Sequence, residues 1–164
     1  MRVLINGLST LKAKTGVGHH IADLYTALGP ADPASEFTLY PGEFLRDLAV
    51  RKKPKTHAGL AKSGGLHAKL VGAGVAAAKF GIRAHFAVYS RSFPFDLYHE
   101  PNFVPMPTAL PTVVTVHDLS VLKYPEWHPA DRVRHHEANF LRGLKRARHV
   151  IVVSEAVRLE SSIR

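Results

Sequence analysis

Short apolar runs alternate with polar or glycine-bearing clusters along this chain, and this alternation restricts the folds that it can adopt. The clearest run is Thr112–Val116, five β-branched residues that lead directly into His117 and Asp118. A continuous run of this kind is typical of a strand that is buried on both faces, as in a parallel sheet covered by helices. We therefore expect an α/β fold with a Rossmann-like, mainly parallel sheet flanked by helices.

The remaining elements can be placed by the same periodicity. Strands are expected at residues 2–6, 36–40, 96–99, 112–116 and 149–153. Helices are expected at residues 17–28, with Gly29-Pro30 as the stop, at 129–148, and from 155 onward, with a weakly helical stretch at 66–80. Strands that alternate with helices in this way indicate β-α-β crossovers.

Length and composition fit one intracellular domain. The chain has 164 residues, which suits a single core, and it has no cysteine, which excludes disulfides and thiolate metal sites. No apolar stretch reaches the length of about 18 residues that a membrane span needs. We expect a cytoplasmic protein without a cofactor or a bound metal.

The net charge of +9 is concentrated in one segment, residues 48–95. This segment has nine lysines and arginines and no acidic residue, whereas the rest of the chain has 13 of each sign. Such a segment attracts phosphorylated ligands, nucleic acid or anionic lipid headgroups without choosing among them. Two hypotheses for this segment stay open: peripheral contact with the inner face of a membrane, and a solvated insertion.

Four polar clusters follow expected strand ends. They are residues 15–18 (TGVG), 99–102 (HEPN), 117–118 (HD) and 154–155 (SE). The carboxyl ends of the strands of an open parallel sheet face one crevice, where ligands bind. The sequence therefore predicts one ligand site built from distant parts of the chain.

Several motifs in the chain resemble a known enzyme family. Residues 96–105 (DLYHEPNFVP), 111–120 (PTVVTVHDLS), 124–129 (YPEWHP) and 150–155 (VIVVSE), with the opening MRVLING and the TGVG loop, resemble the amino-terminal domain of GT-B glycosyltransferases of family 4. The resemblance covers residues 1–28 and 94–160, whereas the cationic middle matches nothing in the family pattern.

The resemblance implies a retaining transferase that moves a sugar from a nucleotide-diphosphate sugar donor to a sugar, polysaccharide or lipid-linked acceptor. Such enzymes have two facing domains, and the second holds most of the donor. This chain lacks the family's paired glutamates, so we expect residues 1–164 to form one acceptor-side domain. The carboxyl-terminal donor-binding domain is then absent from the chain, which would be inactive without it.

The resemblance also assigns roles to the polar clusters. The expected catalytic residues are His117, Asp118 and Glu100. The donor phosphates would lie against Gly16, Val17 and Gly18, where a helix start offers unpaired N–H groups. The acceptor would be held by His99, Asn102, Tyr124 and Ser154. No metal is expected, because metal phosphohydrolase sites need more ligands than one His-Asp pair.

Each assignment has a structural alternative. The two glycines can serve only a tight turn, Asp118 and Ser154 can cap helices, and residues 99–102 can hold a loop rigid. Tyr124 and Trp127 can pack a loop over the sheet. At the level of the whole chain, the alternative is a non-catalytic basic module that binds nucleic acid or anionic surfaces. Because the basic segment shows no motif that reads bases, we expect no specific nucleic-acid partner.

Overall fold

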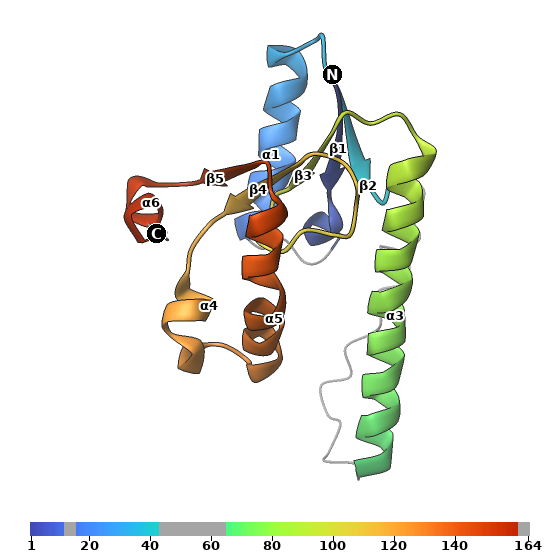
Figure 1. Ribbon diagram of the computed structural model, residues 1–164, viewed down its shortest axis with the longest axis vertical. Helices are drawn as coiled ribbons and strands as arrows, with labels where there is room; N and C mark the ends of the chain where they lie inside the picture. The colour runs from blue at the N-terminus through green and yellow to red at the C-terminus, as the bar shows by residue number, and fades with distance from the viewer. Residues whose placement is uncertain (12–15, 43–64, 161–164) are drawn as a thin grey trace.

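The structure is a computed structural model that describes residues 1–11, 16–42 and 65–160. Five strands form one parallel sheet in the order β2-β1-β3-β4-β5 (Figure 1). The strands are β1 (Arg2–Asn6), β2 (Glu36–Tyr40), β3 (Leu97–Glu100), β4 (Thr112–Val116) and β5 (His149–Val152). The expected α/β fold with a Rossmann-like parallel sheet is confirmed.

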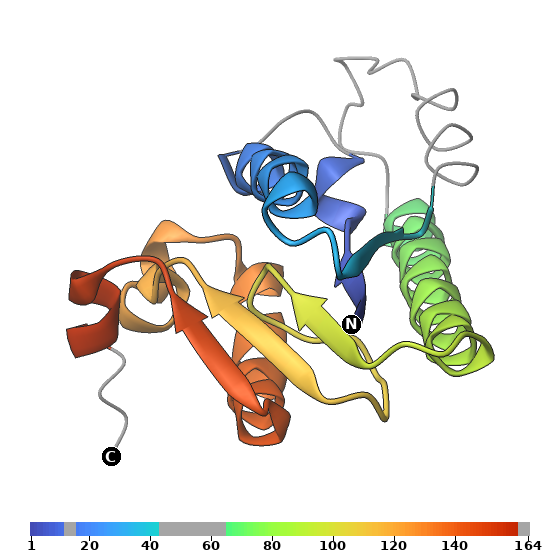
Figure 2. The same ribbon diagram turned by 90° about the horizontal axis from the view of Figure 1, so that it is seen from above.

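Helices connect these strands, and the arrangement can be followed from above in Figure 2. They are α1 (Gly16–Ala31), α3 (Gly65–Ser92), α4 (Ser120–Lys123), α5 (Ala130–Arg146) and α6 (Glu155–Glu160). Two 3-10 turns, η1 (Leu8–Thr10) and η2 (Pro125–Trp127), follow β1 and α4. No helix in the described part of the chain is long and apolar enough to cross a membrane.

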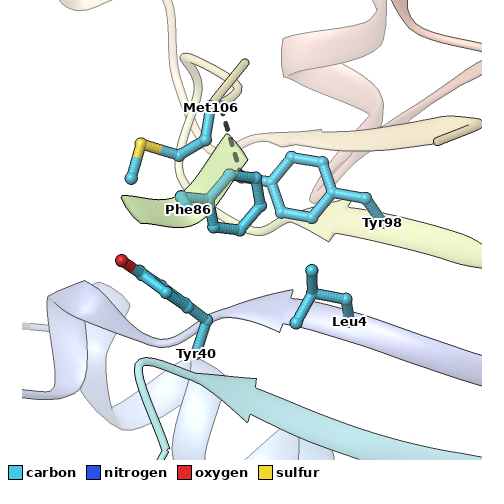
Figure 3. Close-up of a cluster of buried hydrophobic side chains, with 5 residues drawn as sticks. All are labelled: Leu4, Tyr40, Phe86, Tyr98 and Met106. Carbon is cyan, nitrogen blue, oxygen red and sulfur yellow. Dashed lines mark hydrogen bonds between the residues drawn. The ribbon is translucent and has the colours of Figure 1, made fainter. Parts of the chain in front are cut away.

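Alternate residues of each strand point to opposite faces of the sheet, and different helices cover the two faces. On one face, Val3 and Ile5 of β1 pack against Ile21 and Tyr25 of α1. On the other face, Leu4 packs with Tyr98 and with Phe86 of α3, alongside Tyr40 and Met106 (Figure 3). Each fully buried side chain of this size contributes about 1.5–3 kcal/mol, so the two clusters hold the helices to the sheet.

Helix α5 covers the same face as α3, because Phe140 packs on Val114 and Val116 of β4. Gly143 lets α5 approach the chain that follows β3: a Cβ at this position would lie 2.5 Å from Cδ of Pro105. That distance is shorter than any van der Waals contact, so a side chain at Gly143 would push α5 away from the sheet.

Some boundaries differ from those expected. Helix α1 runs through Gly29 and Pro30 to Ala31, because proline in a last turn removes only one helical hydrogen bond. Helix α3 extends to Ser92, since burial of Phe86 outweighs the low helix propensity of its glycines. Strand β3 includes Glu100. Most of the segment expected as a short helix or irregular chain at 41–50, nearly all of the loop expected at 55–65, and the expected helix beyond Glu160 lie outside the described residues.

Candidate functional site

The carboxyl ends of β1 and β3 meet at the point where the strand order reverses. The chain leaves β1 into α1, which packs on one face of the sheet, whereas it leaves β3 into residues 101–111, where Met106 packs on the other face. In sheets of this kind the ligand crevice lies outside the carboxyl ends at this reversal. A cavity of about 560 Å³ is found there. Its walls include four of the residues expected at the site: Val17, Glu100, Asn102 and Asp118.

Glu100 is the most buried polar residue of the crevice, with 1% of its surface exposed. Its Oε2 accepts hydrogen bonds from Asn6 Nδ2 (2.7 Å) and from the Tyr98 hydroxyl (2.5 Å). Its Oε1 accepts one from the backbone N–H of Asn102 (3.0 Å). The carboxyl group therefore joins β1 to β3 and fixes the first residue of the loop that follows Pro101.

Burial raises the pKa of Glu100 to about 7, although its hydrogen bonds act in the opposite direction. A carboxyl group with a pKa near neutrality can hold or release a proton under ordinary conditions, which suits a general acid or base. Its three hydrogen bonds nevertheless occupy both oxygens, so the same geometry also supports a role in holding the loop.

His99 points to the opposite face of the sheet from Glu100, because neighbouring residues of a strand alternate. It is 7% exposed. Its Nδ1 accepts a hydrogen bond from the Tyr25 hydroxyl, and its Nε2 lies 2.8 Å from Thr115 Oγ1. Burial lowers the pKa of His99 to about 4, with the nearby imidazoles of His20 and His117 acting in the same direction. A neutral His99 with both ring nitrogens engaged thus lies inside the core rather than on the crevice wall.

His117 lies beside the crevice at the end of β4. Its Nε2–H donates to the Pro101 carbonyl (2.9 Å), so the ring ties β4 to the loop after β3. The ring also packs edge-on against His20 of α1, with centroids 5.2 Å apart, and against Phe103. The bond from Nε2 leaves Nδ1 as the nitrogen that can accept a hydrogen bond from a ligand.

Asp118 lines the crevice and also fixes the start of α4. Its Oδ1 accepts from the backbone N–H (2.8 Å) and the hydroxyl (2.5 Å) of Ser120. The Ser120 oxygen in turn accepts from His128 Nε2 (3.0 Å). The capping role weighed for Asp118 is therefore present, and it occupies only one of the two carboxylate oxygens.

The glycine loop reaches the crevice through one residue. Val17 lines the cavity, while Gly18 is buried at the first turn of α1 and Gly16 begins that helix. A Cβ at Gly16 would meet no atom of the described residues within 4 Å, so close packing against that part of the chain does not explain this glycine. Thr15 lies outside the described residues.

Tyr124 and Trp127 form an exposed stacked pair outside the cavity. Their ring centroids are 4.2 Å apart at an interplanar angle of 14°, and Trp127 is 68% exposed. The pair adjoins the site because the next residue, His128, lines the crevice.

Ser154 does not reach the cavity. Its Oγ accepts a hydrogen bond from the backbone N–H of Val157 (3.2 Å), as expected for a residue that caps α6.

The crevice also contains residues that the sequence did not single out for a role. They are Asn6, Ser9, Ser120, Arg132 and His136. His136 donates through Nδ1 to the Arg132 carbonyl (3.2 Å), while its Nε2 is buried and has no hydrogen-bond partner among the described residues. A buried acceptor of this kind is costly unless a ligand or water satisfies it. Only helical spacing could have suggested His136, which lies four residues before Phe140.

A metal centre is not indicated in the described part of the chain, where no group of three or more histidine or acidic side chains could hold an ion. The polar groups that line the crevice include imidazole, amide, hydroxyl and carboxylate groups. This set suits hydrogen bonding to hydroxyl-rich or phosphorylated ligands.

The comparison with curated proteins finds a similar bacterial enzyme. The chain is 30% identical over 151 residues to the O-antigen chain mannosyltransferase B of Escherichia coli. The match takes in 89% of this chain and 39% of the relative, so the chain spans about two fifths of that protein's length. No family model matches the chain, and no solved structure matches it. The similarity supports a relationship to the glycosyltransferases.

Proposed function

We propose that this chain is the acceptor-side domain of a retaining GT-B glycosyltransferase of family 4. The enzyme would transfer a sugar from a nucleotide-diphosphate sugar to a polysaccharide or lipid-linked acceptor. The observation that carries the proposal is the crevice at the strand-order reversal, where Val17, Asn102 and Asp118 converge. The similarity to a mannosyltransferase of O-antigen chains supports the same reaction class and favours a polysaccharide acceptor.

On the donor side, we assign contacts to the start of α1 and to His117. The first backbone N–H groups of a helix and its positive dipole end attract a diphosphate. One helix end contributes only about 0.3–2 kcal/mol, well below the roughly 4 kcal/mol of millimolar binding. A second domain must therefore supply most of the donor affinity, and this chain alone would be inactive.

On the acceptor side, His136 lines the cavity, and we assign a hydrogen bond from a sugar hydroxyl to its Nε2, which has no partner among the described residues. Asn102 and the second carboxylate oxygen of Asp118 offer further contacts in the same cavity. The stacked rings of Tyr124 and Trp127 present an aromatic face at the rim, on which the apolar face of a sugar ring can lie. Their geometry fits a chain-like acceptor that extends out of the crevice.

The contacts of His99 and Ser154 support a different role from direct acceptor binding. His99 holds β3 to α1 and β4 through Tyr25 and Thr115, and Ser154 caps α6. We therefore assign them to positioning the strand ends. The site would lie in the cytoplasm, where nucleotide sugars are found. Contact of residues 48–95 with the inner membrane face remains a prediction, because residues 48–64 lie outside the described chain.

Transfer from a panel of labelled nucleotide sugars to oligosaccharide acceptors tests the proposal. The chain by itself should show no turnover, and turnover should appear when a donor-binding domain is joined to it. In that active form, His117→Ala should lower kcat/KM about 100-fold or more, as expected for the loss of a group that stabilises developing charge.

The matched control is His19→Ala, because His19 is an exposed imidazole of the same helix that carries His20 and does not line the crevice. This variant should keep nearly the full rate. Turnover by the chain alone would refute the need for a second domain. Equal activity of His117→Ala and His19→Ala would refute the proposed role of His117 beside this crevice.

A further inference from the structure

A second cavity, of about 480 Å³, lies away from the carboxyl-end crevice. It is enclosed by α3, by α5 and by residues 104–112, the segment that runs from β3 to β4. Two close packings shape it: Gly143 of α5 sits against Pro105, and Thr108 Oγ1 bonds to Ser90 of α3 (3.1 Å). The segment is thereby fixed to both helices, so the cavity is part of the packed fold.

Three arginines line this cavity. Arg83 comes from α3, and Arg142 and Arg146 come from α5, where a spacing of four residues places them on one face. No aspartate or glutamate is among the lining residues. In the described part of the chain, none of these three guanidinium groups forms a salt bridge with a carboxylate, although the charge of Arg83 acts to lower the pKa of Glu100.

The helix dipole explains one of the three arginines. Cations are favourable in the last turn of a helix, and this effect accounts for Arg146 but not for Arg142, which lies one turn earlier in α5. It does not account for Arg83, which lies in the middle of α3 and faces the same cavity from the other side. Arg142 and Arg146 are exposed and Arg83 is half-buried, so water screens part of their mutual repulsion, and an anion between them would offset the remainder.

We propose that this arginine cavity binds a phosphate or diphosphate group. Arginine is suited to this task because its planar fork donates two parallel hydrogen bonds to phosphate oxygens. Asn139 and Thr112 add polar groups to the lining. The same chemistry is offered by a soluble diphosphate and by a lipid phosphate headgroup. This site is separate from the sugar crevice, although Val104 lines both cavities.

Calorimetric titration of the purified protein with sodium pyrophosphate, at constant ionic strength, tests the proposal. We expect saturable binding that becomes at least about tenfold weaker in the double variant Arg142→Gln/Arg146→Gln, because charge-assisted hydrogen bonds are lost. Arg83→Gln should weaken binding in the same direction. The matched control is Arg134→Gln/Lys145→Gln, which removes the same charge from the same helix outside the cavity. It should change Kd by less than about twofold.

Vesicles distinguish the two sources of the phosphate. If the protein sediments with phosphatidylcholine vesicles that contain phosphatidic acid, and pyrophosphate releases it from them, the ligand is a lipid headgroup. Pyrophosphate binding without vesicle binding would identify a soluble ligand. The proposal fails if no saturable pyrophosphate binding occurs, or if the cavity variant and the control variant bind equally well. Loss of sugar transfer alone would leave this result unchanged, so the two proposals can fail separately.

Discussion

Replacing Glu100 by alanine is expected to lower the free energy of unfolding by about 3 kcal/mol. Three donors lose their common acceptor in this variant: Asn6 Nδ2, the Tyr98 hydroxyl and the Asn102 N–H. Each unsatisfied donor in a buried environment costs about 1–3 kcal/mol, and relief from burying the carboxyl offsets part of the total. Urea unfolding followed by circular dichroism measures the difference.

The control for this prediction is Glu137→Ala, since Glu137 is an exposed carboxylate of α5. A surface change of this kind should alter the unfolding free energy by no more than about 0.5 kcal/mol. If Glu100→Ala were as mild as the control, the Glu100 network could not be what joins β1 to β3 at the crevice.

Acidification from pH 7 to pH 4.5 is expected to move the stabilities of Glu100→Gln and His99→Gln in opposite directions, by about 2.5 kcal/mol each. The pKa of Glu100 is raised to about 7 in the folded protein, above its ordinary value of 4.5. The folded state then binds the extra proton, so this contribution to stability is present at low pH and is lost as pH rises through 7.

His99 acts in the opposite sense. Its pKa is lowered to about 4 from 6.5, so between these values the unfolded state binds more protons. This contribution to stability is present above pH 6.5 and is lost as pH falls toward 4. In the unsubstituted protein the two effects nearly cancel over this window. Each substitution removes one of them and exposes the other.

The remaining carboxylates also contribute to the pH dependence of the unfolding free energy. They contribute equally in both variants, so the difference between the variants is free of their contribution. Glu100→Gln should become less stable on acidification, and His99→Gln more stable, when urea midpoints are measured at both pH values. Parallel pH dependence in the two variants would show that the opposed burial of these neighbouring side chains does not govern their titration.

The sheet and its crevice were predictable because their signals are local. The β-branched run at Thr112–Val116 and the helix-period pattern before β5 predict a β-α-β unit. Because its two strands are parallel, the polar residues that follow them lie at the same edge of the sheet. The length of α3 was not predictable in this way. Its glycines weaken a helix, and tertiary contacts extend it, among them the packing of Phe86 against Tyr40 and Tyr98 and of Tyr89 against Tyr40.

The individual roles at the site depend on contacts between distant residues. His99 and Glu100 were grouped as one cluster, but the strand continues through Glu100 and its pleat sends the two side chains to opposite faces. His136 was missed because its importance depends on a buried nitrogen without a partner, which is a property of the packing of α5 and Phe103. Sequence periodicity carries no information about such a nitrogen.

The central claim is that one crevice at the carboxyl edge binds both the donor and the acceptor sugar. Heteronuclear NMR of the ¹⁵N-labelled chain, titrated with nucleotide sugars and with mannose oligosaccharides, tests this claim most directly. We predict weak, saturable shifts at the amides of Val17, Asn102 and Asp118 and at the Trp127 indole, with Kd of about 10 mM or weaker for the nucleotide sugars. Shifts confined to other surfaces, or no saturable shift at these positions, would contradict the account.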